Sequence, residues 1–135
     1  MTHIQWMPHA RRKGPGNIDK AKLAECIQTC FECAQTCGAC ADACLSDETV
    51  AELTKCIRTT LDCVDICVAT GKILARDAGD NAEIGHAVLR ACRAACKACA
   101  DECARHASAG RHCEMCTEAC RRCEQACTDL LASLG

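Results

Sequence analysis

The sequence predicts an all-α protein, an antiparallel up-down-up-down four-helix bundle with a cysteine-lined core. Eighteen of the 135 residues are cysteines, and most of them follow one another at alternating gaps of three and four residues. That spacing keeps side chains on one face of a helix that points to a bundle axis. Turn residues divide the chain into four segments of similar length, whose short connections place neighbours antiparallel. No segment alternates with period two, so strands have no support.

Three clusters of helix-breaking residues set the expected element boundaries. They lie at 46–48, 77–80 and 108–110, where Ser, Asp and Gly gather. We therefore expect helices over residues 19–45, 48–76, 80–107 and 110–133. Residues 1–16 contain two prolines and two glycines and are expected to form a flexible tail. The bundle is then a single domain over residues 17–135.

The helix termini carry recognisable capping residues. Asn17 or Asp19 is expected to cap the first helix, and Gly79 suits the end of the second. Two pairs have the spacing of a capping box, in which the side chain of the first residue and the acid three positions later satisfy each other's backbone amides. They are Thr49 with Glu52, and Asp80 with Glu83.

The cysteines form one row on each predicted helix, and each row should face the bundle axis. Sulfur thus fills the seam that leucine normally occupies. In the second helix, Thr60 stands where another cysteine would fall. The rows, in chain order, are Cys26, Cys30, Cys33, Cys37, Cys40 and Cys44; Cys56, Cys63 and Cys67; Cys92, Cys96, Cys99 and Cys103; and Cys113, Cys116, Cys120, Cys123 and Cys127.

Continuing these rows distinguishes the two ends of the bundle. At one end all four rows run into leucines and should form an apolar plug, consisting of Leu23, Leu74, Leu89 and Leu130. At the other end the rows approach His106 and His112. We expect these imidazoles to act with nearby thiols as ligands where metal enters, although imidazoles at helix ends can also have a purely electrostatic role.

Thiolates are soft ligands, which select Cu(I), zinc or iron–sulfur clusters over hard cations. Cysteines four residues apart on a helix can both reach one ion, and Cu(I) accepts such low coordination numbers, whereas zinc prefers four ligands in a tetrahedron. Sulfurs shared between Cu(I) ions approach neutrality near one copper per thiolate. Burying uncompensated anions is costly, so we expect many Cu(I) ions per chain, about one per cysteine.

Other interpretations of the cysteines remain open. A zinc or mixed-metal buffer of the metallothionein kind is the first alternative, and a redox or structural thiol protein with cross-helix disulfides is the second. Cysteine can also serve as a small buried hydrophobic residue, but eighteen aligned cysteines disfavour this. The ferredoxin spacing of iron–sulfur proteins is absent from the sequence.

Composition excludes several other classes of function. A formal net charge of −2 argues against a nucleic-acid partner, and no apolar run approaches the length of a membrane span. The twin arginines Arg11 and Arg12 precede Lys, Gly and Pro rather than an apolar stretch, so no export signal is expected. We therefore expect a cytoplasmic protein, in which thiols stay reduced. No catalytic constellation is predicted.

The cysteine rows 26–44, 56–67, 92–103 and 113–127 resemble those of the bacterial four-helix-bundle copper storage proteins. The resemblance covers roughly residues 19–133. It implies Cu(I) held along the bundle axis, largely by pairs such as Cys26/Cys30, Cys40/Cys44 and Cys92/Cys96. Because no export signal is expected, the sequence resembles the cytosolic, cysteine-rich branch of this family. Members of that branch form tetramers and have histidines at the mouth of the bundle.

The resemblance also bears on partners. From the cysteine rows and the leucine plug we expect a cytosolic copper store that buffers Cu(I) and can return it, and a copper chaperone is a candidate donor or acceptor. A second apolar stripe beside the cysteine row of the second helix then fits a homotetramer interface, or packing between helices of one bundle. It consists of Ile57, Leu61, Val64 and Val68.

Overall fold

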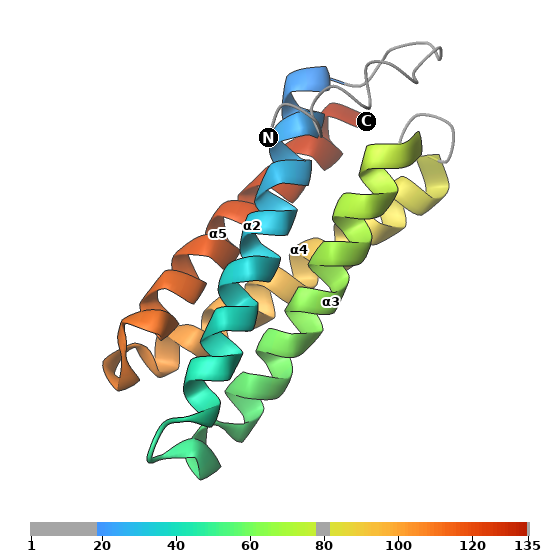
Figure 1. The fold of residues 1–135 in the computed structure, drawn as a ribbon. Coiled ribbons are helices and arrows are strands. Elements are labelled where there is room, and N and C mark those ends of the chain that lie inside the picture. The colour runs from blue at the N-terminus through green and yellow to red at the C-terminus, as the bar shows by residue number, and fades with distance from the viewer. Residues whose placement is uncertain (1–18, 78–81, 135) are drawn as a thin grey trace.

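The computed structural model describes residues 19–77 and 82–134, which form four long α-helices, two short 3₁₀ helices and, within these ranges, no strand (Figure 1). This confirms the predicted all-α fold. The elements are α2 (Lys20–Leu45), η1 (Val50–Leu53), α3 (Thr54–Asp77), α4 (Ala82–Arg105), η2 (Ala107–Ala109) and α5 (Arg111–Leu134).

The helices are arranged as a square in cross-section. Helix α2 packs against α3 and α5, and α4 packs against the same two helices. Among the described residues, the diagonal helices α2 and α4 meet only through side chains at the axis, as between the sulfurs of Cys30 and Cys92 at 3.9 Å. Successive helices run in opposite directions, as predicted (Figure 1). Each helix therefore turns one face toward a common central axis, which is where the cysteine rows were expected to meet.

The first helix begins where a capping residue predicts it. The Asp19 carboxylate accepts hydrogen bonds from the backbone amides of Ala21 at 3.0 Å and Lys22 at 3.1 Å. These bonds satisfy two amides that have no partner within the helix. The predicted alternatives Asn17, Gly79 and Asp80 lie outside the described residues, as does the tail predicted over residues 1–16.

The start predicted for the second helix was wrong. The helix begins at Thr54 rather than residue 48, and the capping box of Thr49 with Glu52 does not form. Instead the Thr49 hydroxyl donates to Asp47 Oδ1 at 2.7 Å, and the Thr49 amide donates to the same oxygen at 2.8 Å. Asp47 thus holds Thr49 in a local turn, so the chain enters α3 through the 3₁₀ helix η1.

The third helix also ends earlier than predicted, at Arg105 rather than residue 107, and η2 follows it. The other boundaries agree with the prediction to within two residues, the usual spread at helix ends.

The core consists mainly of cysteine. All eighteen cysteine side chains are at most 1 % exposed, which confirms that every row faces inward. At one end of the bundle, hereafter the leucine end, the axis is filled by Leu23, Leu74, Leu89 and Leu130, none more than 1 % exposed. The opposite end, with His106, His112 and the two 3₁₀ helices, is the histidine end. The two chain termini of the described bundle lie at the leucine end (Figure 1).

Candidate metal centre

The eighteen cysteines are all free thiols in this structure. Their sulfur–sulfur contacts run from 3.3 Å, between Cys103 and Cys116, to 4.0 Å, between Cys33 and Cys63. A disulfide would require about 2.05 Å. Many of these contacts join different helices. The bundle axis is therefore a continuous column of reduced sulfur atoms, which argues against the disulfide interpretation.

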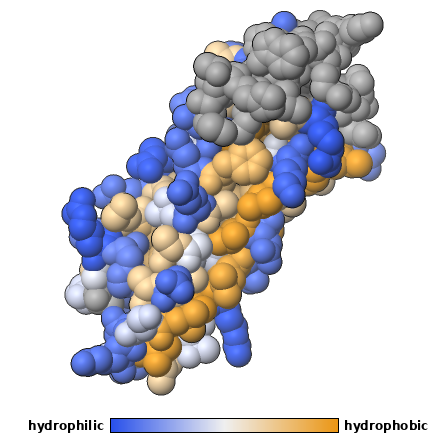
Figure 2. Space-filling view, viewed as in Figure 1, coloured by the Kyte–Doolittle hydropathy of each residue, from blue (hydrophilic) through white to orange (hydrophobic). Residues whose placement is uncertain are grey.

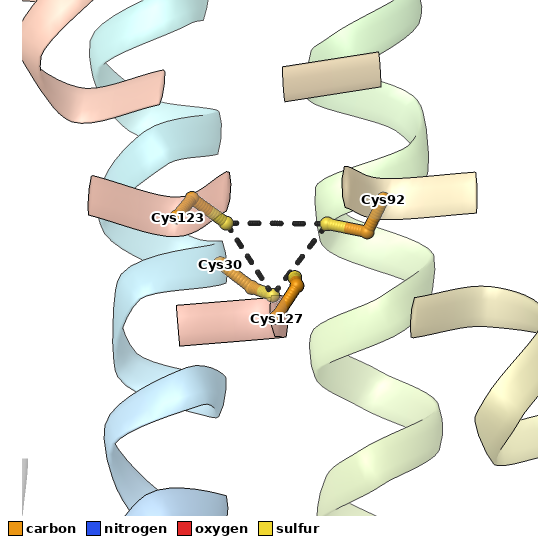
Figure 3. A group of neighbouring side chains, drawn as sticks. All are labelled: Cys30, Cys92, Cys123 and Cys127. Atoms are coloured by element: carbon orange, nitrogen blue, oxygen red, sulfur yellow. Dashed lines mark hydrogen bonds between the residues drawn. The ribbon is translucent and has the colours of Figure 1, made fainter. Parts of the chain in front are cut away.

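The sulfurs gather in groups with the dimensions of metal sites. In one group, Cys30 of α2, Cys92 of α4, and Cys123 and Cys127 of α5 point toward one another (Figure 3). All four sulfurs lie within 4.8 Å of one another. Three helices contribute to this group because the rows of all the helices meet on one axis.

Successive groups along the column share members. Cys33 and Cys63 belong both to a group with Cys67 and Cys96 and to a group with Cys37 and Cys120. Cys37 and Cys120 in turn belong to a further group with Cys99 and Cys116. An ion in one group would thus share sulfur ligands with an ion in the next. This overlap favours bridging thiolates and clustered ions over isolated sites.

At the histidine end, an imidazole joins the thiols. A ring nitrogen of His112 lies within 4.8 Å of the sulfurs of Cys40, Cys44 and Cys113. The His112 Nε2 atom is buried and, among the described residues, has no hydrogen-bond partner. A buried nitrogen without a partner is costly, so a metal ion at this position would satisfy it. The structure thus brings together the predicted site residues Cys44, His112 and Cys113.

Gly110 makes room for this imidazole. A Cβ atom on residue 110 would lie 2.7 Å from Cε1 and 2.8 Å from Nδ1 of His112, closer than real side chains approach. Sequence reasoning treated Gly110 only as a helix breaker. Its spacing two residues before His112 gave no signal of this contact.

His106 has different surroundings. Its Nε2 atom lies 3.2 Å from Oε2 of Glu102, one helical turn earlier in α4. Glu102 is only 7 % exposed, and its other oxygen lies 3.3 Å from Arg105 and 3.8 Å from Lys55. Glu102 thus holds His106 in place as a carboxylate partner, an arrangement common around metal-binding histidines. Sequence reasoning missed Glu102, although its spacing of four residues from His106 was the available signal.

The environment of the thiols determines their protonation. Burial raises the pKa of Cys113 to about 12, and burial also raises the pKa of Cys44. At the leucine end of the column, hydrogen bonds from Cys127 and Cys30 lower the pKa of Cys26 to about 6. The thiols of Cys44 and Cys113 are therefore protonated at neutral pH. A metal ion that binds there displaces protons, because the ligand is the thiolate.

Comparison with known proteins gives a consistent result. Residues 19–132 match the model of a family described as copper storage protein. The chain is similar to the Streptomyces lividans copper storage protein Ccsp loaded with 10 copper equivalents, with 52 % identity, a TM-score of 0.92, and coverage of 96 % of this chain and 98 % of that one. None of the curated proteins matches.

Two further solved structures agree. A Streptomyces lividans Ccsp variant with one histidine replaced by alanine is 58 % identical, with a TM-score of 0.87, over 89 % of this chain and 100 % of that one. A second structure, of a cytosolic copper storage protein from the same organism loaded with five coppers, is 59 % identical to this chain, with a TM-score of 0.83. The match covers 85 % of this chain and 96 % of that one. Among residues 19–77 and 82–134, no helix combines the length and apolarity that a membrane crossing requires.

The raised thiol pKa at the histidine end predicts a stability limit for the metal-free protein. The buried Cys113 thiol stabilises the fold fully below pH 9.0, its ordinary pKa, and this contribution is lost as pH rises toward about 12. The unfolding temperature of the metal-free, reduced protein should therefore fall over that range, as measured by circular dichroism. A Cys44→Ser/Cys113→Ser variant should lose less over the same range, because serine does not titrate there. An equally steep fall in the variant would contradict this origin.

Proposed function

The chain belongs to the copper storage protein family, and we propose that it stores Cu(I) on the thiolates of its bundle core. The observation that carries the proposal is the column of overlapping four-thiol groups, in which neighbouring groups share Cys33, Cys37, Cys63 and Cys120. The proposed role is reversible binding rather than catalysis. It buffers Cu(I) while keeping a supply that the cell can recover.

The chemistry of the column favours Cu(I) over zinc. Soft thiolates bind both metals, but zinc in structural sites takes four ligands of its own in a tetrahedron. Groups that share two cysteines cannot each supply four unshared ligands. Cu(I) accepts two or three sulfurs and tolerates bridging thiolates, so it can use every sulfur of the column.

Charge balance supports a high copper content. A Cu(I) ion held by two unshared thiolates leaves a net negative charge, which is costly to bury among side chains at most 1 % exposed. Sharing each sulfur between ions approaches neutrality near one copper per thiolate. The solved relative loaded with 10 copper equivalents supports multiple ions per chain. We propose all eighteen cysteines as ligands, together with His106 and His112 at the histidine end.

Titration of the reduced protein with Cu(I) against a competing chelator should therefore reach on the order of one copper per cysteine. Circular dichroism should show the same helical content before and after loading, because the thiols already lie in contact without metal. Parallel titration with zinc is the control. Saturation at only a few Cu(I) ions would overturn the storage proposal, and about four zinc ions with tetrahedral spectra would favour the zinc buffer instead.

The histidine end is the proposed route for copper. The leucine end is filled by four buried leucines, whereas His112 joins Cys40, Cys44 and Cys113 at the opposite end. An imidazole nitrogen that lacks a hydrogen-bond partner can accept copper and pass it to the adjacent thiols. His106, held by Glu102, is proposed to act beside it.

Replacing His112 with alanine should slow copper uptake from a chelator by about 10-fold, while the number of ions at saturation barely changes. His106→Ala should slow uptake less, because the His106 ring is bonded to Glu102. Stopped-flow absorbance measures the uptake rate. His86→Ala is the matched control, since His86 bonds to the Ala82 carbonyl at the leucine end. Unchanged rates in the His106→Ala/His112→Ala double variant would leave both histidines with a structural role.

We further propose that the protein is a homotetramer. The stripe on α3 is accessible in the single chain: Leu61 is 46 % exposed, and Ile57, Val64 and Val68 are half-buried. Figure 2 shows an apolar band along the face formed by α2 and α3. Such a band favours association with other copies.

Light scattering should then give the mass of four chains for the wild-type protein. Leu61→Glu should shift it toward smaller species, because a charge is costly to bury in an apolar interface. Leu45→Glu, at a 59 % exposed position at the end of α2, should not. A monomeric wild-type protein would contradict the proposal.

The location and exchange partner complete the proposal. We place the store in the cytosol, as supported by the relative described as cytosolic. We assign a copper chaperone as donor or acceptor, which a copper-transfer assay between the two purified proteins tests.

A further inference from the structure

One hydroxyl group lies inside the sulfur column. Thr60 occupies a position in the cysteine row of α3, and its side chain is 1 % exposed. Its Oγ1 atom lies 3.7 Å from the sulfur of Cys99, 3.8 Å from that of Cys103 and 4.0 Å from that of Cys56. A threonine hydroxyl is therefore surrounded by three thiols that come from two helices.

This hydroxyl differs from its neighbours in its choice of partner. Thr59 donates to the carbonyl of Lys55 at 2.8 Å, and Thr70 donates to the carbonyl of Ile66 at 2.7 Å. Both make the bond to the preceding helical turn that threonine ordinarily makes. Within the described part of the chain, Thr60 instead has thiol sulfurs as its partners. Its hydroxyl is thus available to the metal-binding groups.

The chemistry of the hydroxyl defines what it can do there. A neutral hydroxyl oxygen is a hard ligand and a poor substitute for a thiolate on Cu(I). When Cu(I) displaces the thiol protons, the sulfurs become acceptors only, so the Thr60 O–H must donate. Hydrogen bonds to charged acceptors are the strong ones, and bonds to metal-bound ligands tune metal affinity.

The position of Thr60 places this effect in the half of the column nearer to the histidine end. Cys103 lies two residues before Arg105, the last residue of α4, and three before His106, and Cys56 lies in the first turn of α3. The Cys103 sulfur is 3.8 Å from that of Cys56 and 3.3 Å from that of Cys116. The Cys99 sulfur lies 3.9 Å from that of Cys37 in α2. A bond from Thr60 therefore acts on sulfurs that contact the rows of the other three helices.

We propose that Thr60 is a positioning residue of the copper store, whose single hydroxyl proton is donated to a copper-bound thiolate, that of Cys99 or that of Cys103, and strengthens copper binding in this part of the column. The inference rests on the proposed function. Thr60 adds a neutral hydrogen-bond donor to a site otherwise built of thiols and imidazoles. The hydroxyl offsets thiolate charge at a position of the α3 row that carries no sulfur.

The test compares Thr60→Val with Thr70→Val by competition of the full-length protein with a Cu(I) chelator at fixed pH. Valine has the shape of threonine without the hydroxyl. Thr60→Val should bind a subset of the copper ions about 10-fold more weakly, with the same number at saturation. Thr60→Ser should restore the affinity. Thr70→Val, which removes a hydroxyl bonded to backbone, should keep wild-type affinity even where its unfolding temperature falls.

A second variant probes the position rather than the hydroxyl. Thr60→Cys should add about one Cu(I) at saturation, because residue 60 lies within the column. The inference is overturned if Thr60→Val binds copper as tightly as wild type, if Thr70→Val loses as much affinity, or if Thr60→Cys gains no copper. Failure of the wild-type protein to bind many copper ions would instead overturn the proposed function.

Discussion

A single shared axis is the constraint on which the rest of the structure depends. Each helix places a row of small side chains on one face, and the square arrangement turns all four faces to the same line. Because the rows have the three- and four-residue spacing of a helix face, sulfurs from different helices arrive at matching heights. The thiol contacts, the overlapping groups and the burial of every cysteine follow from this geometry. In the described part of α2 and α4, the axial positions beyond the last cysteine at one end carry leucine, as at Leu23 and Leu89.

The same geometry creates an electrostatic condition. A column of buried sulfur is stable when each sulfur carries a proton, and it is costly when many sulfurs are bare anions. Metal is the other way to neutralise it. Exchange of protons for Cu(I) therefore leaves the charge of the core almost unchanged. The pKa of Cys113 is raised for this reason, because burial disfavours the thiolate anion.

The fold and the sulfur column could be predicted from the sequence because both depend on periodicity. The rows from Cys26 to Cys127 and the plug leucines have strict helical spacing. That spacing determines which face of a helix a residue occupies, whatever the details of side-chain packing. Where one side chain has two nearby hydrogen-bond partners, the sequence pattern does not predict which bond forms. The Thr49 hydroxyl could take part in a capping box with Glu52 or bond to Asp47. It bonds to Asp47, which lies only two residues away in the sequence. The roles of Glu102 and Gly110 could not be predicted from the sequence. They depend on where the imidazoles of His106 and His112 lie, and residue spacing alone does not determine this.

The repeating rows have a consequence for how such a protein can change over evolutionary time. A heptad inserted into every helix lengthens the bundle by about 10 Å and adds two axial positions to each row. Those positions lie far from both ends, so neither the leucines nor the histidines need to change. Capacity therefore scales with length in small, nearly independent steps. A container built on a periodic axis can be enlarged without being redesigned.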